Sequence, residues 1–436
     1  MRIAIVGTGI AGNAAAWALA HRHDITVYEK DPRPGGHSHT LDIDYDGARV
    51  AVDTGFIVYN EPNYPELTAL FDHLGVDTVE SDMSFSVSAD GGRFEWAGRG
   101  ETLLEMLDGL FAQRSNLASP SFLWMLREMQ RFNRTGRADR TAGRIGGCSL
   151  GDYLARHRYA ARLVHDYLLP MGAAIWSTPV DQMLDFPADN FLAFFENHRL
   201  LHWERPFWRT VHGGSHRYVE KLTARFRNRL RLGTPVVCIE RNPRGVVVVD
   251  ACGNRDSYDH VVIAAHSDQA LAMLTDASGR ERSVLGAIRY RPNTVFLHRD
   301  PRLMPKRARA WASWNFLRAD ADPQAKNDVA VTYWMNALQN IDRGRPLFVS
   351  LNPPFDPAPD LTFSRLTCEH PQYDANAFAA QKALAAIQGT RRTWFCGAWT
   401  GYGFHEDGLR SGLAAAEALG ATIPWRAPHF LSEAAE

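Results

Sequence analysis

Two short apolar runs near the start of the chain flank an alanine-rich stretch. Residues 3–6 form a continuous apolar run, as expected for a buried parallel strand, and a second run at residues 25–28 ends in Glu29. Residues 10–20 between them are rich in alanine, which suits a helix packed closely on a sheet. The pattern predicts a strand, a helix and a second strand, which together form a βαβ unit.

The turn after the first strand reads Gly7-Thr-Gly9-Ile-Ala-Gly12. Its first glycine permits a tight turn, its second lets a pyrophosphate approach the backbone, and its third allows close contact between helix and strand. A carboxylate at the end of the second strand can accept hydrogen bonds from a ribose. The unit therefore predicts a dinucleotide site. The cofactor-binding residues expected here are Gly7, Gly9, Ile10, Ala11, Gly12, Glu29 and Lys30.

A second glycine-rich segment, residues 397–412, lies near the other end of the chain and reads as a loop that runs into a short helix of small residues. Exposed N–H groups and the macrodipole favour negative charge at a helix start. Glycines also let a backbone approach a planar ligand closely. Two such sites at opposite ends of one chain can converge on a single large, anionic, partly flat ligand, and a flavin dinucleotide fits that description.

Composition sets limits on function. The 436 residues are 45% hydrophobic and 22% charged with a net charge of −1, which is ordinary globular composition. Near-neutral charge argues against strong attraction to nucleic acid. The five scattered cysteines and the histidines show no metal-ligand spacing, so we expect no metal and a reducing, cytoplasmic location. No signal peptide or long apolar span is predicted.

Further motifs lie between the two glycine-rich ends. They are Pro34-Gly-Gly-His-Ser38, Val52-Asp-Thr-Gly-Phe56, residues 233–239 and residues 260–265. In this order the motifs resemble the flavin amine oxidase superfamily, which includes phytoene-type desaturases and protoporphyrinogen oxidase. The resemblance implies FAD as cofactor. It adds these expected contacts: Gly35, Gly36, His37, Ser38, Gly55, Phe56, Ile57, Val236, Ala265, Gly397, Gly403, His405 and Glu406.

Two positions depart from the family pattern. His37 stands where amine oxidases commonly carry arginine, and the final segment lacks the family's attachment cysteine. Cys396 precedes the loop and is expected to be a small buried side chain at the end of a strand. The FAD is therefore expected to be non-covalent.

The order of the motifs predicts an interleaved architecture. We expect an α/β, Rossmann-type FAD-binding domain, similar to that of amine oxidases, from residues 1–90, 211–280 and 386–425. An α+β substrate-binding domain would comprise residues 91–210 and 281–385, and residues 426–436 would form a C-terminal tail.

Within the predicted substrate-binding domain, residues 103–111 and 122–132 show apolar positions at helical spacing. The second stretch carries Trp124 beside Arg127, Arg131 and Arg134. Such a basic amphipathic helix can lie on a membrane surface, or it can bury its apolar face in the domain and leave its arginines in water.

Aromatic residues are also concentrated in this domain, where they can line a long apolar pocket or form ordinary core. No regular pattern of carboxylates suggests recognition of an amine, which favours a lipophilic substrate. The aromatic residues are Phe191, Phe194, Phe195, Trp203, Phe207, Trp208, Trp311, Trp314, Phe316, Tyr333 and Trp334.

A narrower resemblance rests on residues 34–38, 53–60, 370–374 and 401–408. These segments are similar to a group of bacterial flavoproteins associated with fatty-acyl methylation and to the N-terminal region of plant cyclopropane fatty acid synthases. One branch of the group is a methyl-fatty-acid desaturase of furan fatty acid biosynthesis. The resemblance implies a methyl-branched acyl substrate, O2 or another electron acceptor, and an acyl methyltransferase partner. Peripheral contact with the inner face of the cell membrane is a separate expectation, and it rests on the basic amphipathic stretch around Trp124.

The implied reaction moves a hydride from an allylic carbon to flavin N5, and loss of a proton then gives a conjugated diene. His405 and Glu406 are the candidates for the base, with Tyr59 a weaker one. The alternatives are that His405 and Glu406 present only their backbone N–H groups and that Tyr59 is a pocket wall. At the level of function, the alternatives are a flavin-dependent double-bond isomerase and a non-catalytic FAD-binding partner of a methyltransferase.

Overall fold

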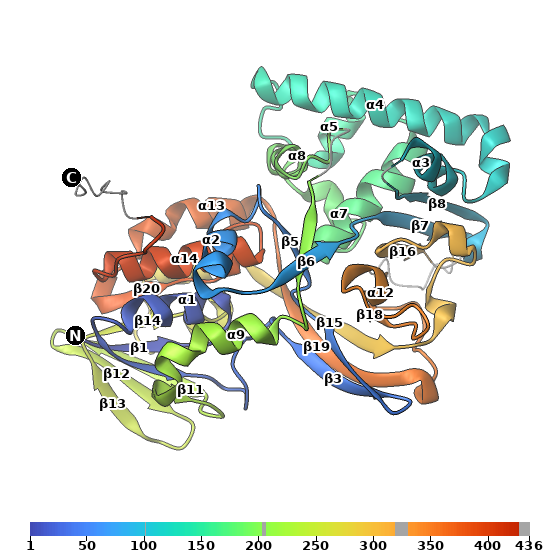
Figure 1. The fold of residues 1–436 in the computed structure, drawn as a ribbon. Coiled ribbons are helices and arrows are strands. Elements are labelled where there is room, and N and C mark those ends of the chain that lie inside the picture. The colour runs from blue at the N-terminus through green and yellow to red at the C-terminus, as the bar shows by residue number, and fades with distance from the viewer. Residues whose placement is uncertain (101, 203–205, 319–329, 427–436) are drawn as a thin grey trace, which may run out of the picture.

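A computed structural model describes residues 1–100, 102–202, 206–318 and 330–426 (Figure 1). Trp203 and all but the first residue of the expected C-terminal tail lie outside these ranges. The chain forms two regions, one of which contains both termini (Figure 1). No helix in the described ranges is long and apolar enough to cross a membrane.

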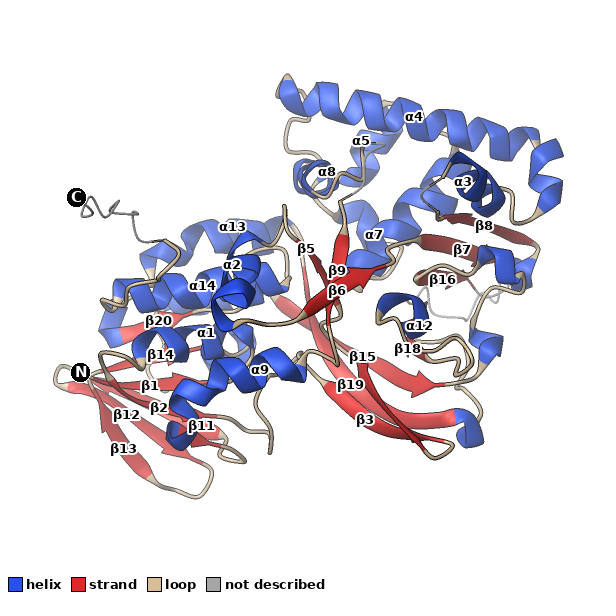
Figure 2. Cartoon of the chain, viewed as in Figure 1, coloured by secondary structure: helices blue, strands red, loops and turns tan. Residues whose placement is uncertain are grey.

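The region with the termini is built on a parallel sheet of five strands. Two helices lie side by side on one face of this sheet, and a three-stranded antiparallel sheet covers the other (Figure 2). The parallel strands are, in spatial order, β10 (Leu230–Arg231), β2 (Asp24–Tyr28), β1 (Arg2–Val6), β14 (His260–Ile263) and β20 (Thr393–Phe395). The two helices are α1 (Ile10–Leu19) and α14 (His405–Ala418), and the covering strands are β11 (Val236–Asn242), β12 (Gly245–Asp250) and β13 (Arg255–Tyr258).

Alternation along β1 explains this layering. Ile3 and Ile5 pack with the helices, whereas Ala4 and Val6 pack with residues of β11 to β13. All four side chains are buried, which agrees with the continuous apolar run in the sequence.

Three glycines allow the helices to approach this closely. A Cβ at Gly12 would lie 1.9 Å from the carbonyl oxygen of Gly7, and a Cβ at Gly412 would lie 2.1 Å from that of Ala11. Gly7 itself has φ +99°, a conformation that other residues rarely adopt. α1 therefore touches both the first strand and α14 through backbone atoms.

The second region is built on a sheet of seven strands, with α3 to α8 gathered on one side (Figure 2). In spatial order the strands are β19 (Thr362–Gln372), β15 (Arg289–His298), β18 (Phe348–Leu351), β17 (Val331–Trp334), β16 (Trp314–Arg318), β7 (Phe85–Ala89) and β8 (Phe94–Gly98). The helices are α3 (Leu103–Leu110), α4 (Pro120–Thr141), α5 (Leu150–Arg156), α6 (Ala161–Leu163), α7 (Leu169–Trp176) and α8 (Ala188–Asn197).

Sheet pairing crosses the expected division of the chain near residue 90 and again near residue 210, where residues 208–211 pair with residues 58–60 and 78–81. β7 pairs with β8 and β16 in the seven-stranded sheet, although the expected boundary assigns it to the first domain. The division into two functional domains otherwise stays a prediction.

Shorter elements complete the two regions and the passages between them. They are the hairpin β3 (Thr40–Tyr45) and β4 (Ala48–Asp53), the small sheet of β5 (Val58–Asn60), β9 (Trp208–Val211) and β6 (Thr78–Ser81), and the helices α2 (Pro65–Leu74), α9 (His216–Thr223), α10 (Ser267–Met273), α11 (Gly279–Leu285), α12 (Met335–Leu338) and α13 (Ala375–Ala383).

The buried carboxylate of Asp53 forms hydrogen bonds that join the β3–β4 hairpin, the start of α9 and the end of α12. It accepts hydrogen bonds from Ser215 N (2.9 Å) and Oγ (2.8 Å), from Thr40 Oγ1 (2.5 Å) and from Gln339 Nε2 (2.8 Å). Burial raises the pKa of Asp53 to about 6, against the opposing effect of these donors. The Asp-x-Gly segment is therefore fixed to the start of α9 and to the segment after α12.

The contact between α1 and α14 gives a first prediction. Gly412→Ala places a methyl group against the Ala11 carbonyl, so we expect the free energy of unfolding to fall by about 1 to 3 kcal/mol, despite the better helix propensity of alanine. Urea unfolding of the FAD-loaded protein measures this.

Gly279→Ala is the matched control, because no atom lies within 4 Å of the added Cβ. It should be neutral or stabilise by about 0.5 kcal/mol. Equal stability of the Gly412→Ala variant and the wild type would contradict the proposed role of the backbone contact.

Candidate active site

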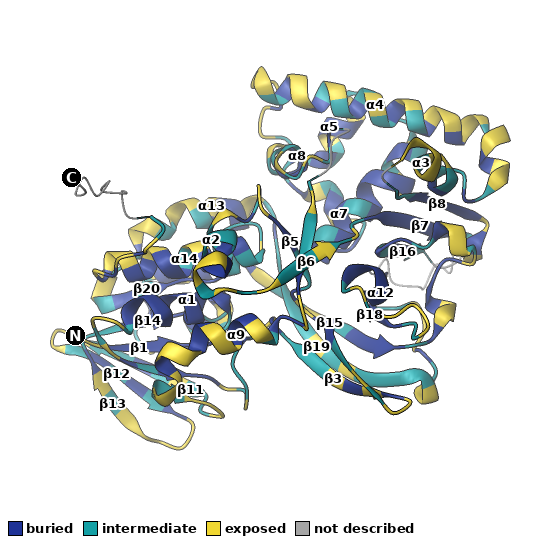
Figure 3. Cartoon of the chain, viewed as in Figure 1, coloured by how far each residue is buried: buried dark blue, intermediate teal, exposed yellow. Residues whose placement is uncertain are grey.

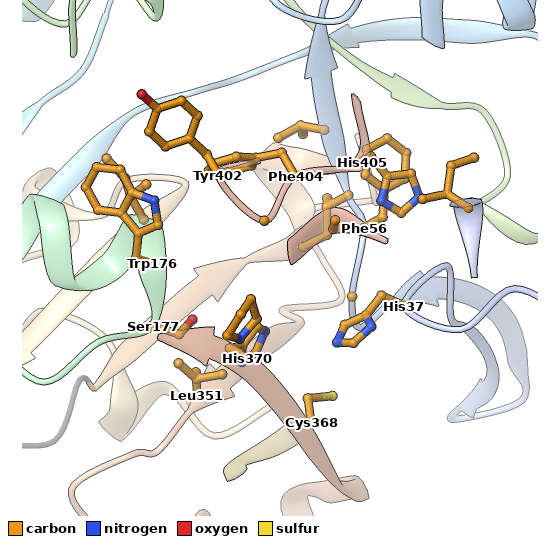
Figure 4. Close-up of a pocket in the computed structure, with 18 of the residues that line it drawn as sticks. His37, Phe56, Trp176, Ser177, Leu351, Cys368, His370, Tyr402, Phe404 and His405 are labelled. Carbon is orange, nitrogen blue, oxygen red and sulfur yellow. The ribbon is translucent and has the colours of Figure 1, made fainter. Parts of the chain in front are cut away.

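A continuous cavity of about 1430 Å³ joins the two regions. Its lining begins at the turn between β1 and α1, passes the loop that carries His37, and reaches α7 and α4. Figure 4 shows its central part, where Phe56 and His405 lie on one side and His370 and Trp176 face the same space. Both glycine-rich ends of the chain contribute to this one cavity.

The start of α1 is suited to a pyrophosphate. No side chain caps this helix, its first turn holds no acidic residue, and its first internal backbone hydrogen bond is donated by Asn13 to Gly9 (3.0 Å). The N–H groups of residues 10–12 are therefore available to an anion. No protein atom lies within 4 Å of the position that a Cβ would take at Gly9, which leaves room for a phosphate.

Glu29, the predicted ribose contact, is held by three hydrogen-bond donors. Its Oε2 accepts hydrogen bonds from Thr8 N (2.8 Å) and Thr8 Oγ1 (2.5 Å), and its Oε1 accepts one from Asp31 N (2.9 Å). The carboxylate lines the cavity with acceptor capacity left for hydroxyl groups. Val236, the expected adenine contact, lines the same end.

Arg33 is a cavity residue that sequence reasoning missed. Its guanidinium donates to the carbonyl oxygens of Gly36 (3.0 Å) and Ser38 (3.3 Å) and so secures the glycine pair. Burial lowers its pKa, but the guanidinium remains charged. The positive charge that His37 does not supply at this loop therefore comes from a residue ahead of the glycine pair.

At the expected flavin end, backbone segments cross closely and aromatic rings stack on one another. A Cβ at Gly55 would lie 2.0 Å from the carbonyl oxygen of His37, so the Asp-x-Gly segment crosses directly against this loop. The ring of His405 stacks on Phe56 with centroids 3.8 Å apart. Its Nε2 lies 2.8 Å from Tyr218 Oη and 2.9 Å from Ser38 Oγ. Burial lowers the pKa of His405 to about 3, so its ring is neutral at neutral pH.

Two of the three predicted bases lie elsewhere, which corrects the prediction. The Glu406 carboxylate accepts the N–H groups of Glu66 and Leu67 (3.0 Å each) at the start of α2. The Tyr59 hydroxyl donates to Thr78 Oγ1 (3.3 Å), and its ring is buried in the core. Neither residue is part of the cavity lining. Glu406 serves as a helix cap and Tyr59 as core, and only His405 keeps its position as a candidate.

Three histidines surround the centre of the cavity. The ring centroid of His37 lies 5.7 Å from that of His370 and 6.5 Å from that of His266. Burial, followed by His37 and His266, lowers the pKa of His370 to about 3, and burial, followed by His37 and Lys30, lowers that of His266 to about 4. All three rings are therefore neutral at neutral pH. No group of residues in the described ranges has the arrangement of a metal site.

A chain of amides fixes the tautomer of His370. The backbone N–H of Thr294 donates to Asn352 Oδ1 (2.8 Å), so the amide nitrogen of Asn352 must be the group that donates to Asn293 Oδ1 (2.7 Å). Asn293 Nδ2 then donates to His370 Nδ1 (2.8 Å). Because Nδ1 accepts, the neutral ring carries its proton on Nε2. His370 is a hydrogen-bond donor at Nε2 and cannot act as a base there.

The half of the cavity in the second region is mainly apolar, with Arg99 and Arg199 also among its lining residues. Phe194, Trp208, Trp314 and Tyr333 line it, whereas Phe191, Phe195 and Phe316 belong to the core, so each interpretation of the aromatic residues holds for part of the set. The carboxylates among the lining residues are Glu29, Asp31 and Glu369, all beside the cofactor end or the histidines. Among the described residues, the apolar half has no carboxylate to pair with an ammonium.

Cys396 is fully buried, and burial raises its pKa to about 12. It is not among the lining residues. Its position fits the expectation that FAD binds without a covalent link.

Comparison with known proteins identifies the family of this chain. The family model of flavin-containing amine oxidoreductases matches residues 10–336. A variant of putrescine oxidase has the same fold with a TM-score of 0.67 at 16% identity, covering 96% of this chain and 99% of that one. A search of curated protein sequences finds no match.

Two further structures show the range of proteins with this fold. A protein described as a protoporphyrinogen oxidase, from Exiguobacterium sp. 255-15, has a TM-score of 0.64 at 19% identity and covers 96% of this chain and 98% of its own. A fatty acid isomerase from P. acnes that produces CLA has a TM-score of 0.62 at 14% identity, covering 96% and 99%.

The fold and the two-ended cavity define an FAD-dependent oxidoreductase. The chain belongs to the flavin-containing amine oxidoreductase family.

The burial of Glu406, which outweighs its capping hydrogen bonds, predicts a pH effect on stability. Burial raises the pKa of Glu406 to about 6, above the value of about 4.3 in an unfolded chain. The stability contributed by its protonation is full below about pH 4.3 and is lost as pH rises through about 6. Glu406→Gln should remove this part of the pH dependence while leaving the rate of flavin reduction unchanged. Unfolding at several pH values and stopped-flow reduction measure the two effects.

A much slower flavin reduction in Glu406→Gln, with an unaltered pH dependence of unfolding, would restore the carboxylate as a catalytic group. Asp53 also titrates near this range, but it is present in both proteins, so their difference isolates Glu406.

The amide chain predicts a tautomer that can be observed. In 15N spectra of histidine-labelled protein, His370 should appear as the Nε2–H form. His198 is an internal reference for the opposite form, since its Nδ1 lies 3.1 Å from the Phe194 carbonyl and must donate. Asn293→Asp should move the His370 proton to Nδ1. A wild-type spectrum with His370 protonated on Nδ1 would refute the assignment.

Proposed function

We propose that this protein is an FAD-dependent desaturase of a methyl-branched unsaturated fatty acyl chain, either in a phospholipid or as a free acid. The observation that carries the proposal is the apolar half of the cavity, whose described lining offers no carboxylate to an amine. A fatty acid isomerase with the same fold supports the idea that this architecture can enclose an acyl chain. The motif resemblance to flavoproteins associated with acyl methylation supports the methyl-branched substrate.

Bound FAD would accept a hydride from an allylic carbon of the substrate, so that loss of a proton leaves a conjugated diene, with O2 or another acceptor taking the electrons later. The protein holds the acyl chain among apolar side chains and keeps water away from the reacting carbon. Residues suited to this are Met83, Trp96, Leu126, Met171, Trp176 and Tyr333.

The proton needs only a weak base, because an allylic cation is a strong carbon acid. We assign this role to His37, whose ring faces the cavity (Figure 4) and makes no hydrogen bond with the described residues. Burial, with Arg33 and Lys30 nearby, lowers the pKa of His37, so the ring is neutral and able to accept. His405 is the alternative, as predicted from the sequence.

A second candidate, a lipid double-bond isomerase, is favoured by the named activity of the structural relative from P. acnes. The same apolar cavity would serve both reactions. They differ in the product, since a desaturase removes two hydrogen atoms and an isomerase removes none. Association with an acyl methyltransferase remains a prediction.

Anaerobic mixing of the FAD-loaded protein with detergent-dispersed methyl-branched monoenoic lipid tests the function. We expect the flavin absorbance to bleach, and the product after one turnover should be two mass units lighter. Bleaching by simple amines, with no response to lipid, would disprove the proposal. An unchanged product mass with a shifted double bond would establish the isomerase instead.

A charge in the apolar half should abolish lipid turnover. Leu126 of α4 lines the cavity, so Leu126→Asp introduces a carboxylate that an acyl chain cannot solvate. We expect at least a tenfold loss of flavin reduction by lipid with FAD content retained. Ala138→Asp is the matched control, because Ala138 lies exposed on the same helix and should leave turnover unchanged.

A further inference from the structure

Exposed apolar side chains of the second region gather on one short stretch of chain. Among the described residues, six of the eleven large exposed apolar side chains lie between residues 103 and 124. Leu103 and Leu104 are 67% and 79% exposed, and Trp124 is 52% exposed. Leu104, Leu107 and Leu117 line one shallow depression together with Phe111. Figure 3 shows the exposed surface of α3 and the outer face of α4. The six residues are Leu103, Leu104, Leu107, Leu117, Leu123 and Trp124, and we call them the apolar face.

Other positions of the same two helices line the cavity. Met106 and Leu110 of α3 contribute to its wall, as do Leu126 and Met129 of α4. α3 is thus apolar on two sides, although a helix that is apolar all round is normally buried. Gly109 lets α3 lie directly on β8, since a Cβ there would come within 2.8 Å of the Ala97 carbonyl oxygen. The same helix therefore carries exposed leucines and side chains that line the apolar half of the cavity.

Positive charge surrounds the apolar face. Asp108 of α3 is flanked by Arg99 (2.9 Å), Arg114 (2.6 Å) and Arg309 (3.8 Å), which together exceed its single negative charge. The guanidinium of Arg127 lies 5.5 Å from the centre of the Trp124 ring. The one other carboxylate of α3, Glu105, belongs to its N-terminal capping box. Apolar side chains bordered by excess arginine suit the interface of an anionic bilayer, where the tryptophan and arginine side chains meet the head groups.

We propose that the apolar face docks on an anionic lipid bilayer, with α3 lying in the head-group region. The acyl substrate passes from the bilayer alongside α3 and α4 into the cavity. This proposal rests on the proposed function for the identity of the substrate, but the docking itself requires no turnover. It extends the expectation for the stretch around Trp124, because α3 carries the most exposed members of the apolar face. α4 buries Phe122, Met125 and Phe132, as the core interpretation expects, and exposes Trp124, which the proposal places at the bilayer.

Vesicle co-sedimentation of the full-length FAD-loaded protein tests the docking. We expect binding to vesicles of phosphatidylglycerol and phosphatidylcholine. The double variant Leu104→Ser, Leu107→Ser should bind about tenfold or more weakly, because two leucines no longer enter the interface. Leu232→Ser, which removes an exposed leucine of the first region (40% exposed), is the matched control and should bind like the wild type. Arg127→Gln should weaken binding to the anionic vesicles about fivefold and leave binding to pure phosphatidylcholine unchanged.

Failure of docking and failure of the proposed function give different results. Equal binding of the double variant and the wild type, or no binding at all, would overturn the docking proposal even if detergent-dispersed lipid bleaches the flavin. If docking is correct and the function is correct, the double variant should lose turnover of vesicle lipid and keep turnover of dispersed lipid. A wild-type dimer that becomes monomeric in the double variant would identify the apolar face as a contact between copies and also overturn the proposal.

Discussion

The close backbone contact among β1, α1 and α14 is the constraint on which the site depends. Without a side chain at Gly12 or Gly412, α1 lies against the turn that precedes it and against the C-terminal helix. This contact brings the starts of two helices, encoded at opposite ends of the chain, to one cavity. The start of α1 supplies unpaired N–H groups for an anionic cofactor, and the start of α14 brings His405 to the same cavity.

Local sequence patterns were sufficient for the βαβ unit, because strand, turn, helix and acid are contiguous and each position has one physical task. Local patterns were insufficient for Glu406 and Tyr59. A motif can place a loop, but the direction of a side chain depends on partners that are distant in sequence, such as the start of α2 for Glu406. The amide chain from Thr294 to His370 joins separate strands and left no local signal. Arg33 was missed because it stands before the motif, on the side where no cation was expected.

The chemistry of the cavity follows from its distribution of charge. Fixed charges lie at the dinucleotide end, where Glu29 and Arg33 are held by backbone groups. The centre contains neutral imidazoles, and the far half is mainly apolar, although Arg99 and Arg199 also line it. Under the proposed function, the lack of a carboxylate in that half suits a hydrocarbon better than a cationic amine.

The pairing of β1 with β14 has a consequence for the synthesis of the protein. β1 is made first, but one of its two neighbours is β14, and β20 and α14 complete the sheet and its cover only near the end of translation. Contacts between residues so far apart in sequence form slowly. The emerging N-terminal segment must therefore remain without half of its native contacts while the intervening chain is made, and cofactor capture has to follow completion of the chain. Newly made protein would depend on chaperones and on FAD supply in the same interval.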